Sequence, residues 1–424
     1  MKGKKYFILI GAFSLILSSS LIIAGEWEVP KQLTISLTND SHPSLFMDSI
    51  GNVHLTWFGW DGNDNEIFYT YSINGTFIPV IKVSNNEGND QLPSLFLDSN
   101  GTAYIAWTGN TSGFYEIYYS KEINDTFSQI EKVTNNTEEN NFVFFDSPVS
   151  FSFFLDFNGI AHIAWQGWDG NDYEIYYVNN SNGNFSSGLN ISKVNTSNNG
   201  NPSLFLDFNG VAHIAWQGWD GNDYEIYNVN NANSSFSQPE LITDNAINDK
   251  DPSLCVDSIG TIHMTWSRKD YESWEIYYIH NLNGGFTLPK RCTYNIAWDA
   301  NSLIKADFKG NIHIIWQSDL DGDEDIYYIN NLDSDTGNFS QLERVTNNDA
   351  NDRFPCLFLD SDGTAHIAWS SNENGNYDIY YSKYILIQNE NERWWFYTFI
   401  LAIMIIGEII FFLILKAWKN KQDT

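Results

Sequence analysis

The sequence predicts an all-β fold: a seven-bladed β-propeller of four-stranded antiparallel blades, followed by a single C-terminal transmembrane helix. Three observations predict it. A line of 15 residues, clearest at Pro93–Trp107, recurs seven times and ends in Trp each time, at steps of 50 to 58 residues. A strand-like segment stands alone before the first copy, and an apolar run follows the last. Short strands at such a period are typical of a propeller. The closing tryptophans are Trp57, Trp107, Trp165, Trp216, Trp266, Trp316 and Trp369.

Each copy of the repeat divides into four β segments separated by turn residues. In the fourth copy the segments are Pro202–Asp207, Val211–Trp216, Tyr224–Val229 and Ser237–Thr243. Asn-Gly and Asp-Gly pairs stand between them, and these residues tolerate the positive φ that tight hairpin turns require. Each copy is therefore expected to form one antiparallel blade.

The ring is expected to close within its last blade. Blade seven supplies only three strand segments, 357–359, 364–369 and 377–384, before the chain leaves the repeat. The missing fourth strand is predicted upstream of blade one at Lys31–Leu37, which aligns with the fourth strand of blade six at Gln341–Thr346. An N-terminal strand that completes the last blade leaves no exposed sheet edge.

The two ends of the chain are expected to place the propeller outside the cell. Residues 1–25 have the charged-then-apolar layout of a secretion signal, either cleaved or retained as a signal anchor. Residues 31–384 are the propeller, and 385–393 are a linker. Residues 394–415 are long and apolar enough for a transmembrane helix, and the lysines of the tail, 416–424, should stay in the cytoplasm. The predicted location is the cell membrane, single-pass, or two-pass if the signal is uncleaved.

The composition limits the partners. The chain carries 22 Lys+Arg against 53 Asp+Glu, a net charge of −31. So acidic a protein repels nucleic acid, and no nucleic-acid partner is expected. Three cysteines in 424 residues exclude a disulfide-built scaffold, while 16 Trp, 23 Tyr and 29 Phe exclude a wholly disordered chain.

The repeat resembles that of TolB-type propellers. Residues 361–369, Ser-Asp-Gly-Thr-Ala-His-Ile-Ala-Trp, followed by 374–380, Asn-Gly-Asn-Tyr-Asp-Ile-Tyr, carry a likeness that extends over 31–384. The repeat also resembles the Asp box of sialidase-like propellers. The Asp box places its aromatic residue three positions after the Gly, whereas Trp107 falls six after Gly101. The resemblance implies the propeller fold and leaves the activity open.

A recurring histidine invites a metal hypothesis that its spacing disfavours. Each copy lies at the same place in a different blade, so the blades hold the histidines apart, and blade two has Tyr104 there. We interpret the His, the repeat Asp and the repeat Ser as a hydrogen-bond network inside each blade. The histidines are His54, His162, His213, His263, His313 and His366.

The loops between the second and third strands are acidic, and three of them carry a Trp. We expect ligand binding there, because Trp rings stack on sugars while carboxylates bind hydroxyls. Packing of each Trp against the neighbouring blade is the alternative. The predicted ligand-binding residues are Trp60, Asp61 and Asp64 in blade one, Trp168, Asp169 and Asp172 in blade three, and Trp219, Asp220 and Asp223 in blade four.

One further acidic loop is the best candidate for a metal site. Asp319, Asp321, Asp323 and Asp325 place oxygen ligands on alternate residues, which suits Ca²⁺. The loop departs from an EF-hand, because its Gly comes fourth and no Glu follows at the twelfth place. A plain hairpin turn is the alternative, and Ca²⁺ is the one cofactor considered.

These features favour a membrane-anchored, cell-surface propeller that acts as a non-enzymatic binding module for a glycan, a cation or a protein. Because strands alternate in direction, both ends of the propeller should emerge on one face, so that the acidic, Trp-bearing loops point outward. No catalytic residue is assigned, since a sialidase needs an arginine cluster. The chain has only Arg268, Arg291, Arg344, Arg353 and Arg393. A sialidase-like glycoside hydrolase, or another hydrolase, is the alternative.

Overall fold

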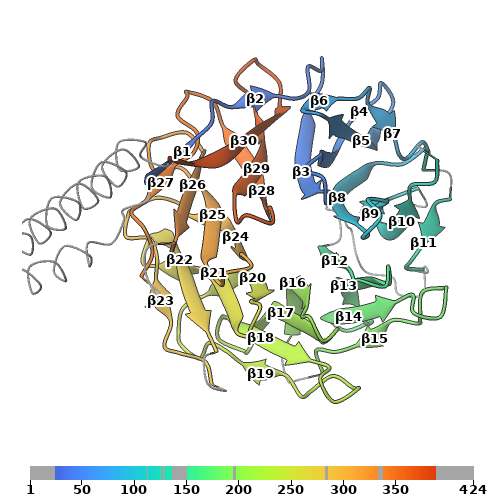
Figure 1. Ribbon diagram of the computed structural model, residues 1–424. Coiled ribbons are helices and arrows are strands. Elements are labelled where there is room, and N and C mark those ends of the chain that lie inside the picture. The colour runs from blue at the N-terminus through green and yellow to red at the C-terminus, as the bar shows by residue number, and fades with distance from the viewer. Residues whose placement is uncertain are drawn as a thin grey trace, which may run out of the picture. The chain divides into compact units, whose positions relative to one another are not determined.

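Seven β-sheets form a ring (Figure 1). The computed structural model describes residues 24–387, apart from 112, 125, 128, 136–149, 194–196, 282–284 and 333–337. The compact unit that holds the ring is Trp27–Tyr384. The predicted all-β, seven-bladed propeller with four antiparallel strands to a blade is confirmed.

Each blade runs from a first strand on the inside of the ring to a short fourth strand at the rim. Blade one is β3 (Asp40–Met47), β4 (Val53–Trp60), β5 (Asn65–Ile73) and β7 (Ile81–Lys82), with a small extra strand β6 (Thr76–Phe77). Blade two is β8 (Asp90–Leu97), β9 (Ala103–Gly109), β10 (Glu116–Lys121) and β11 (Glu131–Lys132). Blade three is β12 (Phe151–Leu155), β13 (Ala161–Trp168), β14 (Tyr173–Asn179) and β15 (Leu189–Asn190). Blade four is β16 (Ser197–Leu206), β17 (Ala212–Trp219), β18 (Tyr224–Asn230) and β19 (Glu240–Leu241).

The remaining three blades repeat this order. Blade five is β20 (Asp249–Val256), β21 (Ile262–Asp270), β22 (Ser273–His280) and β23 (Lys290–Arg291). Blade six is β24 (Ala300–Ala306), β25 (Ile312–Ser318), β26 (Asp325–Asn330) and β27 (Glu343–Arg344). Blade seven is β28 (Asp352–Leu359), β29 (Ala365–Ser371) and β30 (Asp378–Ile387), joined by β2 (Lys31–Gln32) and β1 (Ala24–Trp27). The fourth strands are shorter than predicted, with two paired residues each.

The predicted closure of blade seven by the N-terminal segment is confirmed. Strand β2 pairs antiparallel with β30, with Lys31 opposite Tyr381 and Gln32 opposite Tyr380. The Leu33 N–H then donates to the Ile379 carbonyl at 2.7 Å. Residues more than 340 positions apart therefore share one blade, and every blade has a neighbour on both sides.

The turns between first and second strands depend on the repeat Asp and on Gly. The Asp98 carboxylate accepts the N–H groups of Asn100 at 2.9 Å and Thr102 at 3.0 Å. Gly101 stands at φ +82°, a left-handed conformation that a side chain would strain. The Asp-x-x-Gly spacing of the repeat is thus explained by this turn.

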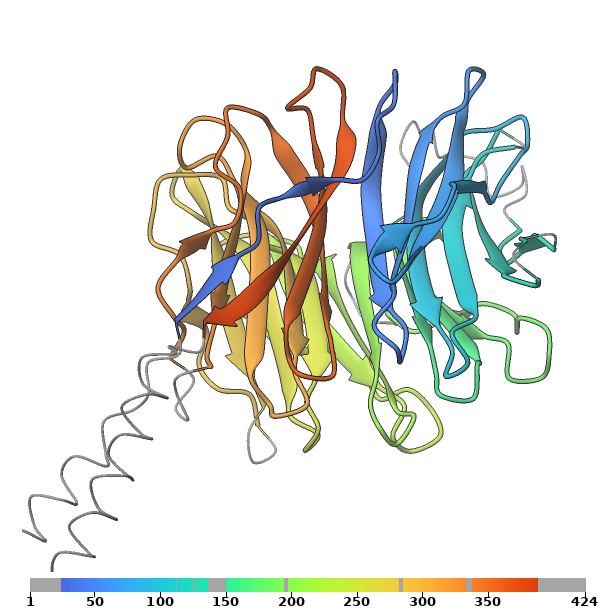
Figure 2. The same ribbon diagram turned by 45° about the horizontal axis from the view of Figure 1, so that its top comes forward.

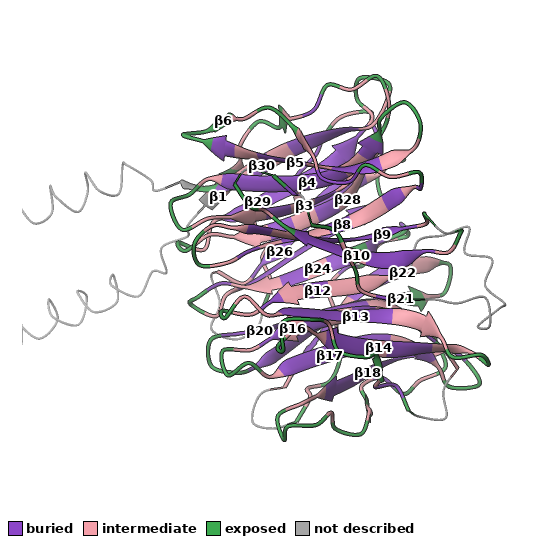
Figure 3. Cartoon of the chain, turned by 90° about the vertical axis from the view of Figure 1, so that its right-hand side faces the viewer, coloured by how far each residue is buried: buried purple, intermediate pink, exposed green. Residues whose placement is uncertain are grey.

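The core lies between neighbouring blades (Figure 3). Trp216 is fully buried and belongs to the same apolar cluster as Ile175 and Tyr177 of blade three. Its ring stacks on Tyr227 of its own blade, with centroids 5.9 Å apart. The other repeat tryptophans are similarly buried, so each contributes to the contact that holds adjacent blades together.

The recurring histidines make hydrogen bonds inside the blades, with a partner that the sequence did not reveal. His54 Nδ1 lies 2.6 Å from the hydroxyl of Tyr69, which stands on the third strand. Burial lowers the pKa of His54. The other imidazole nitrogen faces the repeat Asp. In blade five, His263 Nε2 lies 3.2 Å from Asp257 Oδ2. In blade two, the Tyr104 hydroxyl donates to Asp98 instead, at 3.4 Å.

The repeat Ser was expected inside this network, and that part of the prediction is wrong. Ser44 Oγ accepts the N–H of Leu95 at 3.0 Å, and Ser203 Oγ accepts the N–H of Leu254 at 3.1 Å. The acceptor and donor in each pair belong to neighbouring first strands. The serine therefore joins one blade to the next, because its side chain points along the ring instead of into its own sheet.

The propeller has two distinct faces (Figure 2). We call the face with the loops between second and third strands and the links between blades the top face. The opposite face, with the turns between first and second strands, is the bottom face. Trp27 and Tyr384, the two ends of the propeller unit, lie with their rings 5.3 Å apart at the bottom. The top face is therefore the one opposite to both ends.

Most of the predicted terminal segments lie outside the described residues. Of the predicted signal 1–25, only Ala24 and Gly25 are described, and the predicted span 394–415 and tail 416–424 are not. Among the residues that the structure describes, no helix is long and apolar enough to cross a membrane.

Candidate active site at the channel mouth

A cavity of about 680 Å³ opens at the axis of the propeller, lined by the first strands of all seven blades. Six of these strands enter it through a non-glycine residue in the left-handed region, with φ between 50° and 54°. We call these six positions the mouth residues. They are His42, Leu92, Asn201, Asp251, Asn301 and Phe354. Such a conformation costs about 1–3 kcal/mol per residue, and it clusters at functional sites.

The mouth position varies from blade to blade while its surroundings repeat. A Pro directly follows the mouth residue in five of the six blades. The residue after that Pro is Ser, or Cys356 in blade seven. The mouth residue itself is successively imidazole, aliphatic, amide, carboxyl, amide and aromatic. Packing within a blade does not select these side chains, because the seven blades pack alike. This variable column was the signal that sequence reasoning missed.

The mouth residues are held by the blade before them. The Asp251 N–H donates to Gln217 Oε1 at 2.9 Å, and the Phe354 N–H donates to Gln317 Oε1 at 3.1 Å. The His42 N–H donates to Ser370 Oγ at 3.2 Å. Each acceptor directly follows the closing Trp of its blade. Each of these three hydrogen bonds crosses the boundary between two blades, so neighbouring blades hold these mouth residues in place.

His42 is poised to act as a base. Its ring stacks on Phe354, with centroids 3.6 Å apart, and on Phe58 at 5.3 Å. Its Nδ1 lies 2.9 Å from Ser41 Oγ. Burial between the two aromatic rings lowers the pKa of His42 to about 4. The imidazole is consequently neutral near pH 7, and with Nδ1–H donating to Ser41 the Nε2 atom can accept a proton.

Asp251 has the opposite tendency. The Asn201 amide donates to Asp251 Oδ1 at 2.5 Å. Burial raises the pKa of the Asp251 carboxyl, so this group holds its proton to a higher pH than an exposed Asp. His42 and Asp251 line the same cavity. Two groups whose pKa values are pushed in opposite directions are the arrangement that supplies a base and an acid to one reaction.

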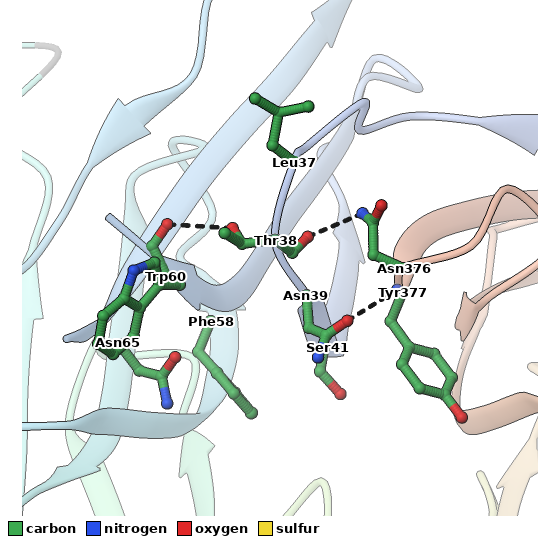
Figure 4. Close-up of a pocket in the computed structure, with 9 residues that line it drawn as sticks. All are labelled: Leu37, Thr38, Asn39, Ser41, Phe58, Trp60, Asn65, Asn376 and Tyr377. Carbon is green, nitrogen blue, oxygen red and sulfur yellow. Dashed lines mark hydrogen bonds between the residues drawn. The ribbon is translucent and has the colours of Figure 1, made fainter. Parts of the chain in front are cut away.

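A second hollow adjoins the mouth between blades seven and one (Figure 4). We call it the blade seven–one groove; its volume is about 600 Å³. The segment 37–39, which links the closing strand to blade one, forms one wall. The lining residues are Leu37, Thr38, Asn39, Ser41, Phe58, Trp60, Asn65, Asn376 and Tyr377. Ser41 and Phe58 contact His42, so the groove and the mouth share a boundary.

The predicted ligand-binding residues lie on three separate hairpins of the top face, and only Trp60 lines the groove. In each hairpin the first Asp closes the turn. Asp61 Oδ1 accepts the Asn63 N–H, Asp169 Oδ1 accepts the Asn171 N–H and Asp220 Oδ1 accepts the Asn222 N–H, at 2.7 to 2.8 Å. Trp168 and Trp219 pack edge-on against a Tyr of their own hairpin. A ligand role for the blade-three and blade-four residues Asp172 and Asp223 stays a prediction.

The loop predicted to bind calcium is already paired with an arginine from the fourth strand of its blade, β27. Arg344 pairs with Asp321 at 2.8 Å and also with Asp325. Asp319 Oδ1 accepts the Trp298 N–H at 2.6 Å, and Asp323 lies beside Asp325. In the described part of the chain, the groups whose carboxylates converge closely enough for a metal ion are elsewhere. They are Asp61, Asp64 and Glu66 in blade one, and Asp169, Asp172 and Glu174 in blade three.

No protein-family model matches this sequence, and no curated protein matches it. Solved structures share its fold at low identity. A polysaccharide lyase, Uly1, is 11% identical, covers 87% of this chain and 94% of its own, and has a TM-score of 0.56. An ulvan lyase of family PL25, bound to -[GlcA(1-4)Rha3S]-, is 10% identical, with coverages of 83% and 95% and a TM-score of 0.58. A protein of unknown function from Dyadobacter fermentans is 12% identical, with coverages of 86% and 99% and a TM-score of 0.54.

These likenesses correct one prediction. The expectation of a non-enzymatic binding module is contradicted, because the solved propellers similar to this chain include polysaccharide lyases. An arginine cluster is needed only to hold a carboxylated sugar, so its absence does not exclude other substrates. Of the residues that the structure describes, no arginine lines the cavity that His42 and Asp251 share.

Proposed function

We propose that this propeller is an enzyme that cleaves glycosidic bonds in a polysaccharide at the mouth of its channel. One observation carries the proposal: His42 and Asp251, with oppositely shifted pKa values, line one cavity at positions exempt from the repeat. A glycoside hydrolase or other hydrolase, the alternative that the sequence left open, is one kind of enzyme that cleaves such bonds. The similar polysaccharide lyases support cleavage of a polysaccharide in general.

The chemistry of bond cleavage assigns a role to each group. The carbon–oxygen bond breaks when the leaving oxygen takes a proton, which the Asp251 carboxyl supplies. His42 removes a proton from the group that completes the reaction. In hydrolysis that group is water, which adds to the carbon. In elimination it is the carbon–hydrogen bond beside the carboxyl group of a uronate residue, whose electrons form a double bond as the leaving oxygen departs. In both cases Asp251 gives up one proton and His42 takes up one.

The test is cleavage of purified polysaccharides by the full chain. New reducing ends report either reaction, and only elimination also produces an unsaturated sugar that absorbs ultraviolet light. We expect His42→Gln and Asp251→Asn each to lower kcat by about 10²- to 10⁴-fold. Asp362→Asn, on an exposed turn of the bottom face, is the matched control and should retain full activity. Full activity in both mouth variants, or no cleavage of any polysaccharide, would refute the proposal.

The proposal includes a place in the cell. A signal in residues 1–25 and a span at 394–415 would export the propeller and tether it to the membrane, where a polysaccharide is accessible. The acidic top face would then be the substrate-facing side. Calcium, predicted at Asp319, Asp321, Asp323 and Asp325 where Arg344 already pairs with two of the carboxylates, is better supported as a structural ion at Asp169, Asp172 and Glu174, none of which lines the cavity.

A further inference from the structure

The blade seven–one groove has the composition of a sugar-binding site. We infer that it binds one neutral sugar residue of the polysaccharide, with the Trp60 ring as the stacking surface. This inference rests on the proposed function and deepens it, because it names the class of substrate. Three features carry it: the charge of the groove, the free face of Trp60 and its fixed polar groups.

The groove is uncharged in a strongly acidic protein. All nine residues that line it are neutral, although the chain as a whole carries a charge of −31. The adjoining hairpin carries Asp61 and Asp64. An acidic sugar, whether a uronate or a sulfate ester, would find no cation in the lining and would be repelled by Asp64, whereas Asp61 is already paired with Lys82 at 2.6 Å. A neutral hexose or pentose meets none.

Trp60 is free because its hairpin lacks a tyrosine. In blades three and four the equivalent tryptophans face a Tyr across the hairpin: Trp168 meets Tyr173 at 5.2 Å, and Trp219 meets Tyr224 at 5.3 Å. In blade one the residue opposite Trp60 is Asn65. Trp60 is consequently 43% exposed. The substitution removes a covering ring and supplies an amide, the two changes that sugar binding requires.

The wall opposite Trp60 is held in place. The Asn376 amide donates to the carbonyls of Ser36 and Thr38, both at 2.9 Å, and Asn39 Oδ1 accepts the Tyr377 N–H at 3.0 Å. Thr38 Oγ1 donates to the Trp60 carbonyl at 3.2 Å, which joins the wall to the hairpin (Figure 4).

Two polar groups of the groove remain available to a ligand. Among the described residues, none hydrogen-bonds the Asn65 side-chain amide or the Tyr377 hydroxyl. Phe58 stacks on the His42 ring at 5.3 Å and separates the groove from the mouth. A sugar on Trp60 would therefore occupy a subsite beside the bond that His42 and Asp251 cleave.

The decisive variant is Asn65→Tyr, which restores the ring pair of blades three and four. Those blades show that a tyrosine fits opposite the Trp, so the variant should fold, and thermal unfolding checks that it does. Binding is measured by calorimetry and Trp fluorescence with cello-, xylo-, manno- and laminari-hexaose as neutral probes, and hexagalacturonate as the acidic probe. The Asp251→Asn background slows turnover during the binding measurement. Phe157→Ala, which removes an exposed ring from the bottom face, is the matched control.

We expect a neutral hexaose to bind and the acidic one not to bind. Trp60→Ala and Asn65→Tyr should each weaken binding about tenfold, while Phe157→Ala leaves it unchanged. Binding that is equal in all variants, binding of hexagalacturonate alone, or no binding of any hexaose would overturn the inference. With active enzyme, the groove variants should raise KM and spare kcat. Cleavage with an unchanged KM would refute the groove alone, whereas binding without cleavage would refute only the proposed function.

Discussion

A buried indole N–H needs an acceptor, and in blades four to seven the start of the first strand supplies one to the repeat Trp. Trp266 donates to Asp249 at 2.8 Å, and Trp369 donates to Asp352 at 3.1 Å. Burial raises the pKa of Asp352 to about 6. In blade four the acceptor is Asn199, which receives the Trp216 N–H at 3.0 Å and cannot ionise. The same role is thus filled by a titrating and a non-titrating residue.

The ionisable acceptor Asp352 and the non-ionisable acceptor Asn199 predict how the stability of the propeller depends on pH. Because the folded pKa of Asp352 lies above its unfolded value, its contribution is fully present below about pH 4 and is lost as the pH rises through about 6. Asp352→Asn should therefore gain about 1–3 kcal/mol of unfolding free energy, relative to wild type, between pH 4 and pH 8. Denaturant unfolding of both chains at pH 4 and pH 8 measures this change. A stability cost of the amide that is the same at both pH values cancels in the comparison.

The reverse change is the control for that experiment. Asn199→Asp should introduce a loss of stability on raising the pH over the same interval, because it places a new carboxyl at an equivalent buried position. A relative stability of Asp352→Asn that does not change between the two pH values would contradict the raised pKa.

For the proposed cleavage reaction, the mouth residues predict how activity depends on pH. His42 acts as a base only when neutral, so activity should rise as the pH passes about 4. Asp251 acts as an acid only when protonated, so activity should fall as the pH passes its raised pKa. A profile of kcat/KM against pH measures both limbs. His42→Gln should remove the rising limb, and Asp251→Asn the falling one; limbs that persist in the residual activity would reassign the roles.

Residues of the repeat could be predicted from the sequence, and residues of the site could not. The Trp, Asp and Gly columns are constant and the His column changes only to Tyr104 in blade two, because every blade makes nearly the same contacts, so the structural role of these residues can be recognised. His42 and Asp251 stand in a column whose residue type varies from blade to blade. Their importance follows from a positive φ and from a cavity that forms only when seven first strands converge.

At the scale of strands, the fourth strand of most blades brings a cation to the carboxylate of the third. Lys82 lies 3.1 Å from Glu66, Lys132 lies 2.9 Å from Glu116 and Arg291 lies 2.6 Å from Glu275. In blade three the equivalent residue is Asn190. There Asp169, Asp172 and Glu174 converge, and burial raises the pKa of Glu174. A divalent ion would occupy the place of the missing ammonium.

We therefore predict that Ca²⁺ stabilises the propeller through blade three. At tenfold excess over its Kd, Ca²⁺ should raise the unfolding free energy by about 1.4 kcal/mol, which corresponds to a Tm increase of about 2–4 °C. Asn190→Lys should abolish this response by supplying a fixed charge. Leu241→Lys, the same change in blade four, should retain it. Differential scanning calorimetry with Ca²⁺ and with EDTA measures all three chains; equal responses would place the ion elsewhere.

The strand pattern was predictable because turn residues mark every hairpin, yet strand lengths were not. A fourth strand such as Glu240–Leu241 pairs over two residues only, although the sequence around it suggests a longer one. The Thr243 side chain explains the difference. Its Oγ1 accepts the Ile226 N–H at 2.9 Å, so a side chain replaces the backbone acceptor where the strands diverge.

At the scale of the molecule, blade seven repeats that arrangement with residues from both ends of the chain. Thr34 Oγ1 accepts the Ile379 N–H at 2.9 Å and donates to Asp378 at 3.1 Å. Gln32 and the Ser36 N–H also donate to Asp378, both at 2.9 Å. The joint that closes the ring is thus built like the inside of an ordinary blade.

Closure predicts a graded response to mutation. Thr34→Val removes both hydrogen bonds of the joint and should cost about 1–3 kcal/mol of unfolding free energy, similar to Thr243→Val in blade four. Deletion of Lys31–Leu37 opens blade seven and should abolish cooperative unfolding. Circular dichroism melts measure all three chains. A deletion variant that melts like the parent would show that the ring does not depend on its shared blade.

The shared blade also orders events in time. Lys31–Leu37 is among the first parts of the fold to be synthesised, and its partner, Asp378–Ile387, is the last. The nascent chain must hold its opening segment unpaired until Asp378–Ile387 has been synthesised, and any product that stops before that strand keeps an open sheet edge at both sides of the gap. Unpaired edges attract other chains. A chain that stops before β30 would therefore form an open arc prone to aggregation, and the ring can close only after its last strand has left the ribosome.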